Sequence, residues 1–277
     1  MESERVRLGL KINQSITAKN VLELKGLTIQ FGGLKAVADV SFALERRKIT
    51  ALIGPNGAGK TTVFNMLTGV YLPTAGDILF KGASIRGLRP HEITARGIAR
   101  TFQNIRLFKD LSVLDNLRVA ADLHDPSGLI ASALRSSGFE ARQRRTTSEA
   151  MELLAIFGME SKADEVARCL PYGQQRALEL ARAMATGAEL LLLDEPAAGL
   201  NNQETHDLMA IIKRIRDEFG ITVLLIEHDM KLVMGISEHI VVLDHGEKIA
   251  EGGVEEVRNN PKVLEAYLGR AKEKKTS

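Results

Sequence analysis

Residues 54–61, GPNGAGKT, lie between an apolar run, ITALI (49–53), and an amphipathic segment, TVFNMLTG (62–69). A short apolar run rich in β-branched residues predicts a buried strand, and the helical spacing of apolar residues after it predicts a helix. A glycine-rich loop between a strand and a helix is the context that a phosphate-binding P-loop requires. The sequence therefore predicts a nucleotide site at this loop.

The residue types in the loop explain how it would hold phosphate. Glycines let backbone N–H groups converge on phosphate oxygens, and the N-terminus of the following helix adds positive potential. Lys60 is expected to reach the outer phosphates, and the Thr61 hydroxyl is expected to bind Mg²⁺. The predicted nucleotide-binding residues here are Gly54, Pro55, Asn56, Gly57, Ala58, Gly59, Lys60, Thr61 and Thr62.

Other apolar runs of strand length indicate an α/β protein. AELLLLDEP (188–196) and GITVLLIEH (220–228) each follow a helical segment, as parallel strands buried on both faces do. Shorter β-rich runs occur near the N-terminus, in VLELKGLTIQF (21–31) and GDILFKG (76–82). The predicted loop therefore belongs to a sheet whose strands are separated by helices.

The middle of the chain, residues 104–185, is predicted to be a helical subdomain inserted between strands. Ser112 precedes Val113-Leu114-Asp115 in the pattern of a helix start. Residues 1–20 are expected to form a flexible N-terminal extension and residues 270–277 a polar tail. One compact unit over residues 21–269 is the simplest organisation, since no low-complexity linker interrupts it.

Composition narrows the class of protein. The 277 residues are 44% hydrophobic and 26% charged with a net charge of +2, which suits a globular protein and provides no strong attraction for nucleic acid. The single cysteine, Cys169, excludes an internal disulfide and is expected to be a small buried residue. No apolar run approaches the about 20 residues of a membrane span, which predicts a cytoplasmic protein.

Two adjacent carboxylates end the predicted strand in LLLLDEP (190–196). A pair of carboxylates at a strand end can be structural. Beside a P-loop, we expect Asp194 to hold Mg²⁺ and Glu195 to polarise the attacking water, because phosphoryl transfer depends mainly on positioning and charge stabilisation.

The order of motifs resembles that of the ATP-binding cassette (ABC) family over nearly all of residues 21–269. After the P-loop come RTFQN (100–104), YGQQRALELARAMA (172–185), LLLLDEP, AAGLN (197–201) and LLIEHD (224–229). The resemblance implies an α/β fold with a RecA-like P-loop NTPase core, an antiparallel β subdomain and an inserted α-helical subdomain. It also implies that ATP and Mg²⁺ are the bound groups.

The resemblance assigns roles to residues outside the P-loop. It implies that Gln103 touches Mg²⁺ or the attacking water and that His228 contacts the γ-phosphate, so that Gln103, Glu195 and His228 form the catalytic set. Considered alone, His228 would be a buried or helix-capping histidine. The resemblance also places Phe31 against adenine, with Val37 beside the nucleotide, although Phe31 alone would be predicted to be a core residue. The metal ligands it implies are Thr61, Gln103 and Asp194.

In this family two cassettes pair head to tail, so that Tyr172, Gly173 and Gln174 are expected to bind the partner's nucleotide. Pro171 stands where the family usually has serine, and proline offers neither a hydroxyl nor a backbone N–H. Pro171 either weakens this half of the paired site or simply shapes the start of the helix. Both interpretations stay open at this point.

Finer features resemble the LivG-type ATPases of bacterial branched-chain amino-acid importers, in DEPAAGLN (194–201) and VRNNPKVLEAYLG (257–269). That resemblance implies permease subunits, a second ABC ATPase in a homodimer or heterodimer, and a periplasmic or extracellular solute-binding protein, with no nucleic acid. It implies a peripheral location on the cytoplasmic face of a prokaryotic inner membrane. ATPases of lipopolysaccharide export or of urea and amide import are alternatives.

Two classes of protein that do not energise transport fit the sequence less well. A cassette acting on ribosomes or DNA usually carries two P-loops or a long coiled-coil insertion, and this sequence has one P-loop and no such insertion. A regulatory pseudo-ATPase would be expected to lack Lys60, Glu195 or His228, and all three are present.

Overall fold

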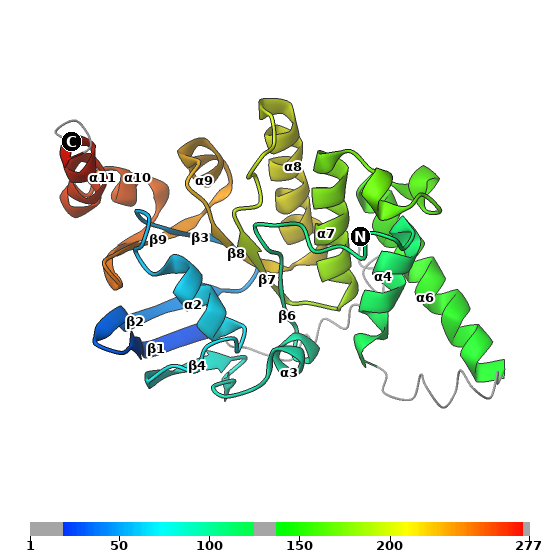
Figure 1. Cartoon of the computed structure of the whole chain (residues 1–277), viewed down its shortest axis with the longest axis horizontal. Coiled ribbons are helices and arrows are strands. Elements are labelled where there is room, and N and C mark those ends of the chain that lie inside the picture. Colours follow the sequence, from blue (N-terminus) through cyan, green and yellow to red (C-terminus); the bar gives the residue numbers. More distant parts are fainter. Residues whose placement is uncertain (1–18, 125–136, 274–277) are drawn as a thin grey trace.

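The computed structural model describes residues 19–124 and 137–273, which form two sheets flanked by helices (Figure 1). One sheet is antiparallel, in the order β2 (Leu34–Glu45), β1 (Asn20–Phe31), β4 (Ala75–Phe80) and β5 (Ala83–Ser84). The other has the order β10 (Glu247–Gly252), β9 (His239–Asp244), β3 (Ile49–Ile53), β8 (Thr222–Ile226), β7 (Leu190–Asp194) and β6 (Ile98–Arg100). Its neighbours from β9 to β6 pair in parallel, and β10 is antiparallel.

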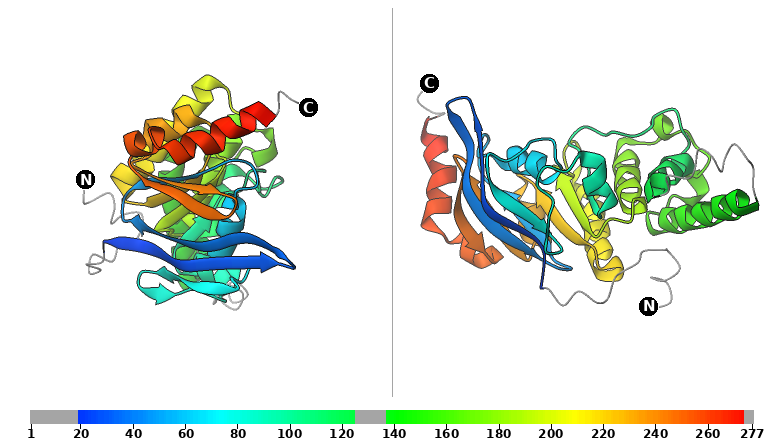
Figure 2. Two further views of the ribbon diagram at one scale, coloured as in Figure 1. Left: turned by 90° about the vertical axis from the view of Figure 1, so that its left-hand side faces the viewer. Right: turned by 90° about the horizontal axis from the view of Figure 1, so that it is seen from below.

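Helices cover the six-stranded sheet and form a separate group at one end of the molecule. Those near the sheet are α2 (Lys60–Leu67), α3 (Pro90–Ala95), α8 (Asn202–Phe219), α9 (Met230–Ile236), α10 (Val254–Arg258) and α11 (Pro261–Glu273). Between β6 and β7 lie α4 (Val113–Ala121), α6 (Ser137–Ile156), α7 (Tyr172–Ala185) and the short turns Asp122–His124, Glu160–Lys162 and Ala167–Cys169. Figures 1 and 2 show this group at the opposite end from α11. The predicted α/β core, antiparallel subdomain and helical insertion are confirmed.

The central strands are buried on both faces because helices or the second sheet cover each side. Every residue of β3, β7 and β8 is buried. Successive side chains of a strand point to opposite faces. Leu191 and Leu193 accordingly pack toward the α-helical insertion and α8, whereas Leu190 and Leu192 pack toward α2 and the antiparallel sheet. Strand β7 thereby joins the two halves of the core.

Glycines allow the P-loop to fit between β2 and β9. Gly59 has φ 96°, and a Cβ on it would lie 2.7 Å from the carbonyl oxygen of Ala36. Gly54 also has positive φ, and a Cβ there would collide with the Leu243 carbonyl. Any larger residue at either position would have to displace backbone.

The expectation for Cys169 is wrong: its side chain is exposed, because the short turn that it ends directs Ala167 and Leu170 into the core.

The Ser112 hydroxyl caps α4 by accepting from the Asp115 N–H at 3.0 Å. Helix α11 continues to Glu273, into the segment expected to be a tail, whereas most of the expected N-terminal extension lies outside the described residues.

Within residues 19–124 and 137–273, no helix combines the length and the apolar composition that crossing a membrane requires.

Removing a core side chain from β7 tests the packing. Leu192→Ala should lower the free energy of unfolding by about 2–5 kcal/mol, because it opens a cavity between the sheet and α2. The matched control is Leu72→Ala, whose side chain is 64% exposed and whose loss should change stability by less than about 0.5 kcal/mol. Urea denaturation of both variants measures the difference, and equal effects would contradict the assigned core.

Candidate nucleotide-binding and catalytic site

The parallel strands bring three sequence motifs to one edge of the sheet. The P-loop follows β3, Asp194 ends β7, and His228 comes two residues after β8. Strand β8 lies between the other two, with Ile226 paired to Leu52 of β3 and to Asp194 of β7. Since the carboxyl ends of parallel strands meet at the same edge, these motifs converge there.

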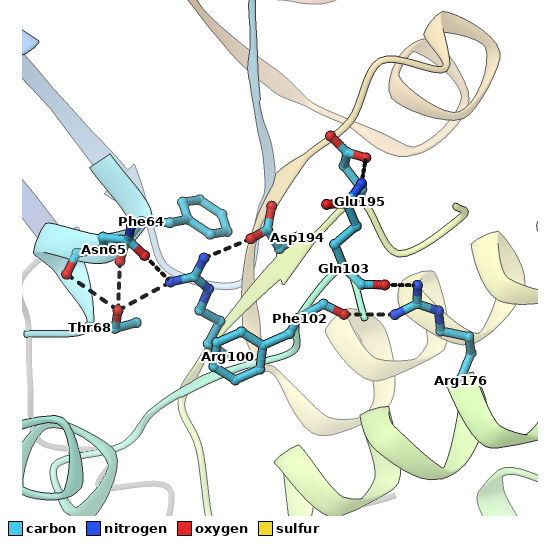
Figure 3. A network of polar contacts seen from close by, with 9 residues as sticks. All are labelled: Phe64, Asn65, Thr68, Arg100, Phe102, Gln103, Arg176, Asp194 and Glu195. Carbon is cyan, nitrogen blue, oxygen red and sulfur yellow. Dashed lines mark hydrogen bonds and ion pairs between the residues drawn. The ribbon is translucent and has the colours of Figure 1, made fainter. Parts of the chain in front are cut away.

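The three residues predicted to be catalytic lie in contact. The Gln103 amide donates from Nε2 to Oε2 of Glu195 at 2.8 Å, and Nδ1 of His228 lies 3.8 Å from the same oxygen (Figure 3 shows the first contact). The His228 side chain is 69% exposed. It is therefore not a buried histidine, which is what we would expect of this residue without the family resemblance. A carboxylate between an amide and an imidazole is suited to orient a water molecule.

The backbone at Glu195 is unusual. Its φ is 47°, in the left-handed region that non-glycine residues rarely adopt, and its N–H donates to the Ile226 carbonyl at 3.0 Å. Such a conformation costs on the order of 1–3 kcal/mol and persists only where surrounding contacts hold it. The Glu195 side chain is 26% exposed, whereas that of its neighbour Asp194 is 10% exposed.

Asp194 is paired with a buried arginine that the sequence analysis did not identify. Arg100 donates to Oδ2 of Asp194 at 2.7 Å and to Oδ1 of Asn65 at 2.8 Å (Figure 3). The side chains of Arg100 and Asp194 are 7% and 10% exposed. The guanidinium also lies 4.9 Å from the ring centre of Phe102 and 5.5 Å from that of Phe64. Arg100 thus connects the end of β6, the carboxylate of β7 and the P-loop helix α2.

The P-loop has the geometry of an anion site. Gly59 is the N-cap of α2 and leaves the first turn of that helix without a side-chain cap. The Lys60 ammonium contacts the carbonyl oxygens of Gly54 and Pro55 at 2.7 and 2.9 Å, within the loop itself. Thr61 is exposed and Thr62 half-buried in the first turn. Uncapped N–H groups and a cation around one loop favour phosphate.

Residues 37–198 match the family described as ABC transporter.

The chain belongs to the ABC transporter family.

Residues 247–273 of this ABC protein also match a family described as branched-chain amino acid ATP-binding cassette transporter. It is 49% identical over 254 residues to the high-affinity branched-chain amino acid transport ATP-binding protein BraF of Pseudomonas aeruginosa, over 92% of this chain and 100% of the relative. The ADP conformation of an ATP-binding cassette of an ABC transporter superimposes with a TM-score of 0.78 at 30% identity, over 91% and 100% of the two chains. A dimeric ATP-binding cassette bound to ADP and phosphate gives 0.69 at 25% identity, over 84% and 98%.

Phe31 lies at the tip of the β1–β2 hairpin of the cassette and pairs with Tyr71, which follows α2. Phe31 is 46% exposed, and its ring contacts Tyr71 edge-on with centroids 5.2 Å apart. The exposure of Phe31 does not fit a core residue. Val37, in contrast, is completely buried beneath the P-loop, where its methyl group lies close to Gly59. Of these two residues predicted to contact the nucleotide, only Phe31 presents its side chain at the surface.

The segment predicted to bind a partner's nucleotide starts α7. Pro171 is its N-cap, with φ −52° and no side-chain hydrogen bond to the first turn. Gly173 packs against Glu204 of α8, and the Gln174 amide accepts from Lys162 at 2.7 Å. Figure 1 shows α7 apart from α2, with β7 and β8 between them. The α7 segment and the P-loop therefore lie at separate places within one cassette.

Glu227 is another residue that the sequence analysis missed. It is 2% exposed, and it accepts hydrogen bonds from the N–H groups of Ala197 at 2.9 Å and His228 at 3.2 Å. Burial raises the pKa of Glu227, and these backbone donors oppose that shift. The carboxylate ties the segment after Glu195 to the segment that carries His228. A glutamate at the buried end of an apolar strand was the only signal in the sequence.

The groups predicted to hold Mg²⁺ are all oxygen donors: the Thr61 hydroxyl, the Gln103 amide and the Asp194 carboxylate. Among the described residues, no cluster of three or more His, Cys, Asp or Glu residues could form a metal site by itself. Mg²⁺ is commonly bound by one or two carboxylates together with substrate phosphates, so this donor set fits it.

The buried pair in the ABC cassette can be tested by a double-mutant cycle. Arg100→Met should lower the free energy of unfolding by about 3–5 kcal/mol, because it leaves the Asp194 carboxylate buried without its cation. In an Asp194→Asn background, Arg100→Met should lower the free energy of unfolding by about 1 kcal/mol less, or a larger difference, than it does in the native background. Denaturation of the four proteins measures the coupling, and strictly additive effects would contradict it.

Proposed function

We propose that this ABC protein is the ATP-hydrolysing subunit of a membrane importer for branched-chain or related amino acids. The observation that carries the ATPase assignment is the contact of Gln103, Glu195 and His228 at the strand edge where the P-loop begins. The match of residues 247–273 to the branched-chain amino acid family, and the name of the Pseudomonas relative, support the solute.

In this proposal the P-loop binds the phosphates and Glu195 activates water. The backbone N–H groups of residues 54–62 and the Lys60 ammonium hold the β- and γ-phosphates, while Phe31 stacks on adenine. Val37 supports the loop from below. Glu195 accepts a hydrogen bond from the attacking water, and Gln103 and His228 orient that water and the γ-phosphate. Mg²⁺, when bound, neutralises charge on the phosphate oxygens, and Thr61, Gln103 and Asp194 are the residues that would hold it.

The proposal includes a head-to-tail pair of cassettes. The first turn of α7, at Tyr172, Gly173 and Gln174, offers backbone N–H groups to the nucleotide of the partner. The dimeric cassette among the similar structures supports such a pair. The second cassette is either a copy of this chain or a related ATPase.

Import also needs subunits that cross the membrane and bind the solute. We propose that permease subunits dock beside Gln103 and the helices between β6 and β7, with a periplasmic or extracellular solute-binding protein completing the system. The cassette would then lie on the cytoplasmic face of the membrane, held there by the permeases.

Two substitutions separate binding from chemistry. Glu195→Gln should keep ATP binding and lower turnover by roughly 10²–10⁴-fold, because an amide does not accept the proton of the attacking water. Lys60→Ala should weaken ATP binding by about tenfold or more, because the phosphates lose a charged hydrogen-bond donor. Fluorescent-nucleotide titration and phosphate release measure both effects, and near-normal turnover of Glu195→Gln would refute the assigned role.

Transport coupling is tested with the permeases. The chain alone should hydrolyse ATP slowly and gain several-fold in rate when reconstituted with its permeases and a branched-chain amino acid. ATPase activity in proteoliposomes, with and without solute and binding protein, gives the measurement. Stimulation by a different solute alone would retain the ATPase assignment and reject the amino-acid assignment.

A further inference from the structure

The Tyr172 side chain connects the start of α7 to the loop that follows Glu195. Its hydroxyl donates to the Ala198 carbonyl at 3.1 Å and accepts from Arg176 Nη2 at 3.1 Å. Its ring covers Gly199, where an added Cβ would lie 3.2 Å from the ring. Since Gly199 has φ 80°, both the backbone conformation and the contact disfavour a larger residue.

Arg176 extends this connection to the segment that carries Gln103. It is 4% exposed, and its two Nη groups donate to the carbonyls of Phe102, at 2.7 Å, and of Gln103 (Figure 3). Nη1 of Arg176 also donates to Oε2 of Glu179 at 3.3 Å, and Oε1 of Glu179 accepts from the Arg106 N–H at 3.2 Å. Helix α7 therefore fixes the backbone of residues 102–106 through buried charged groups.

These contacts form a closed ring that includes Glu195. Glu195 contacts the Gln103 amide, the Gln103 carbonyl contacts Arg176, and Arg176 contacts Tyr172. Tyr172 contacts Ala198, whose N–H donates back to the Glu195 carbonyl at 3.1 Å. Tyr172 is 43% exposed, so its side chain lies partly outside the buried core. What these contacts add is a fixed position of the α7 start relative to Glu195.

We propose that the Tyr172 hydroxyl is a positioning group that couples the two nucleotide sites of the pair. It ties this chain's own Glu195 and Gln103 to the turn that the chain presents to its partner's ATP. The inference rests on the proposed head-to-tail function. It assigns to the Tyr172 side chain a role separate from that of its backbone N–H.

The test is Tyr172→Phe, which removes one oxygen atom and keeps the ring over Gly199. Thr94→Val is the matched control, because the Thr94 hydroxyl also donates a single hydrogen bond to backbone, at Pro90, 3.0 Å away in α3. Both changes are made in the full chain, with and without Glu195→Gln. The measurements are ATP affinity, hydrogen exchange of residues 196–201, and ATP-driven pairing by analytical ultracentrifugation, for the chain alone and mixed with the second ATPase of its transporter.

Thr94→Val should leave the ATP affinity of the isolated chain unchanged, because Thr94 lies in α3, away from every residue assigned to the nucleotide. Tyr172→Phe should speed hydrogen exchange in residues 196–201 and weaken ATP-driven pairing by about threefold or more, because the hydrogen bonds of the hydroxyl to Ala198 and Arg176 are both lost. Thr94→Val should change neither. If the chain with the native Tyr172 pairs, and Tyr172→Phe pairs equally well with unchanged hydrogen exchange in residues 196–201, the inference is overturned. If the chain that carries only Glu195→Gln does not pair, either alone or mixed with the second ATPase, the proposed head-to-tail function itself fails, and the coupling fails with it.

Discussion

The parallel pairing of β3, β8 and β7 is the constraint on which the site depends. Ile226 of β8 pairs with both Leu52 of β3 and Asp194 of β7, so the carboxyl ends of the three strands are in register. The P-loop, the carboxylates and His228 therefore follow these strands at the same edge of the sheet. A register shift of one residue in β7 would turn Leu191 and Leu193 toward the wrong half of the core. Burial of the strands therefore also fixes the geometry of the candidate site.

That geometry includes features that are unfavourable when considered locally. Glu195 has a strained φ, and Arg100 and Asp194 form a buried ion pair whose desolvation offsets much of its attraction. Each is held by contacts to a different element: Glu195 by the Ile226 carbonyl, and Arg100 by Asn65 of α2. The unfavourable features lie where a carboxylate must be presented in one orientation, and the apolar core on both sides of the sheet stabilises them.

The sequence was sufficient for the P-loop, the buried strands of the core and the helical insertion, because glycine spacing and apolar runs are local signals. It was insufficient for Arg100, Glu227 and the Tyr172 contacts, because these depend on which buried polar group meets which backbone after the strands pair. Phe31 shows the same limit: its apolar character predicts burial, yet the hairpin tip leaves it exposed. Cys169 was predicted wrongly because the direction of one residue in a short turn is set by its neighbours Ala167 and Leu170.

The start of α7 gives Pro171 a physical interpretation. Helix α8 starts with Asn201, whose side chain accepts from the N–H groups of Gln203 and Glu204, and the start of that helix is therefore satisfied within the chain. Helix α7 has no such cap, and a helix leaves the N–H groups of its first turn without intrahelical partners. A serine hydroxyl at position 171 could fold back as a cap and occupy those donors. Proline cannot, and it restricts φ at the start of the helix, so its side chain leaves the N–H groups of residues 172–174 for the partner's nucleotide in the proposed head-to-tail pair.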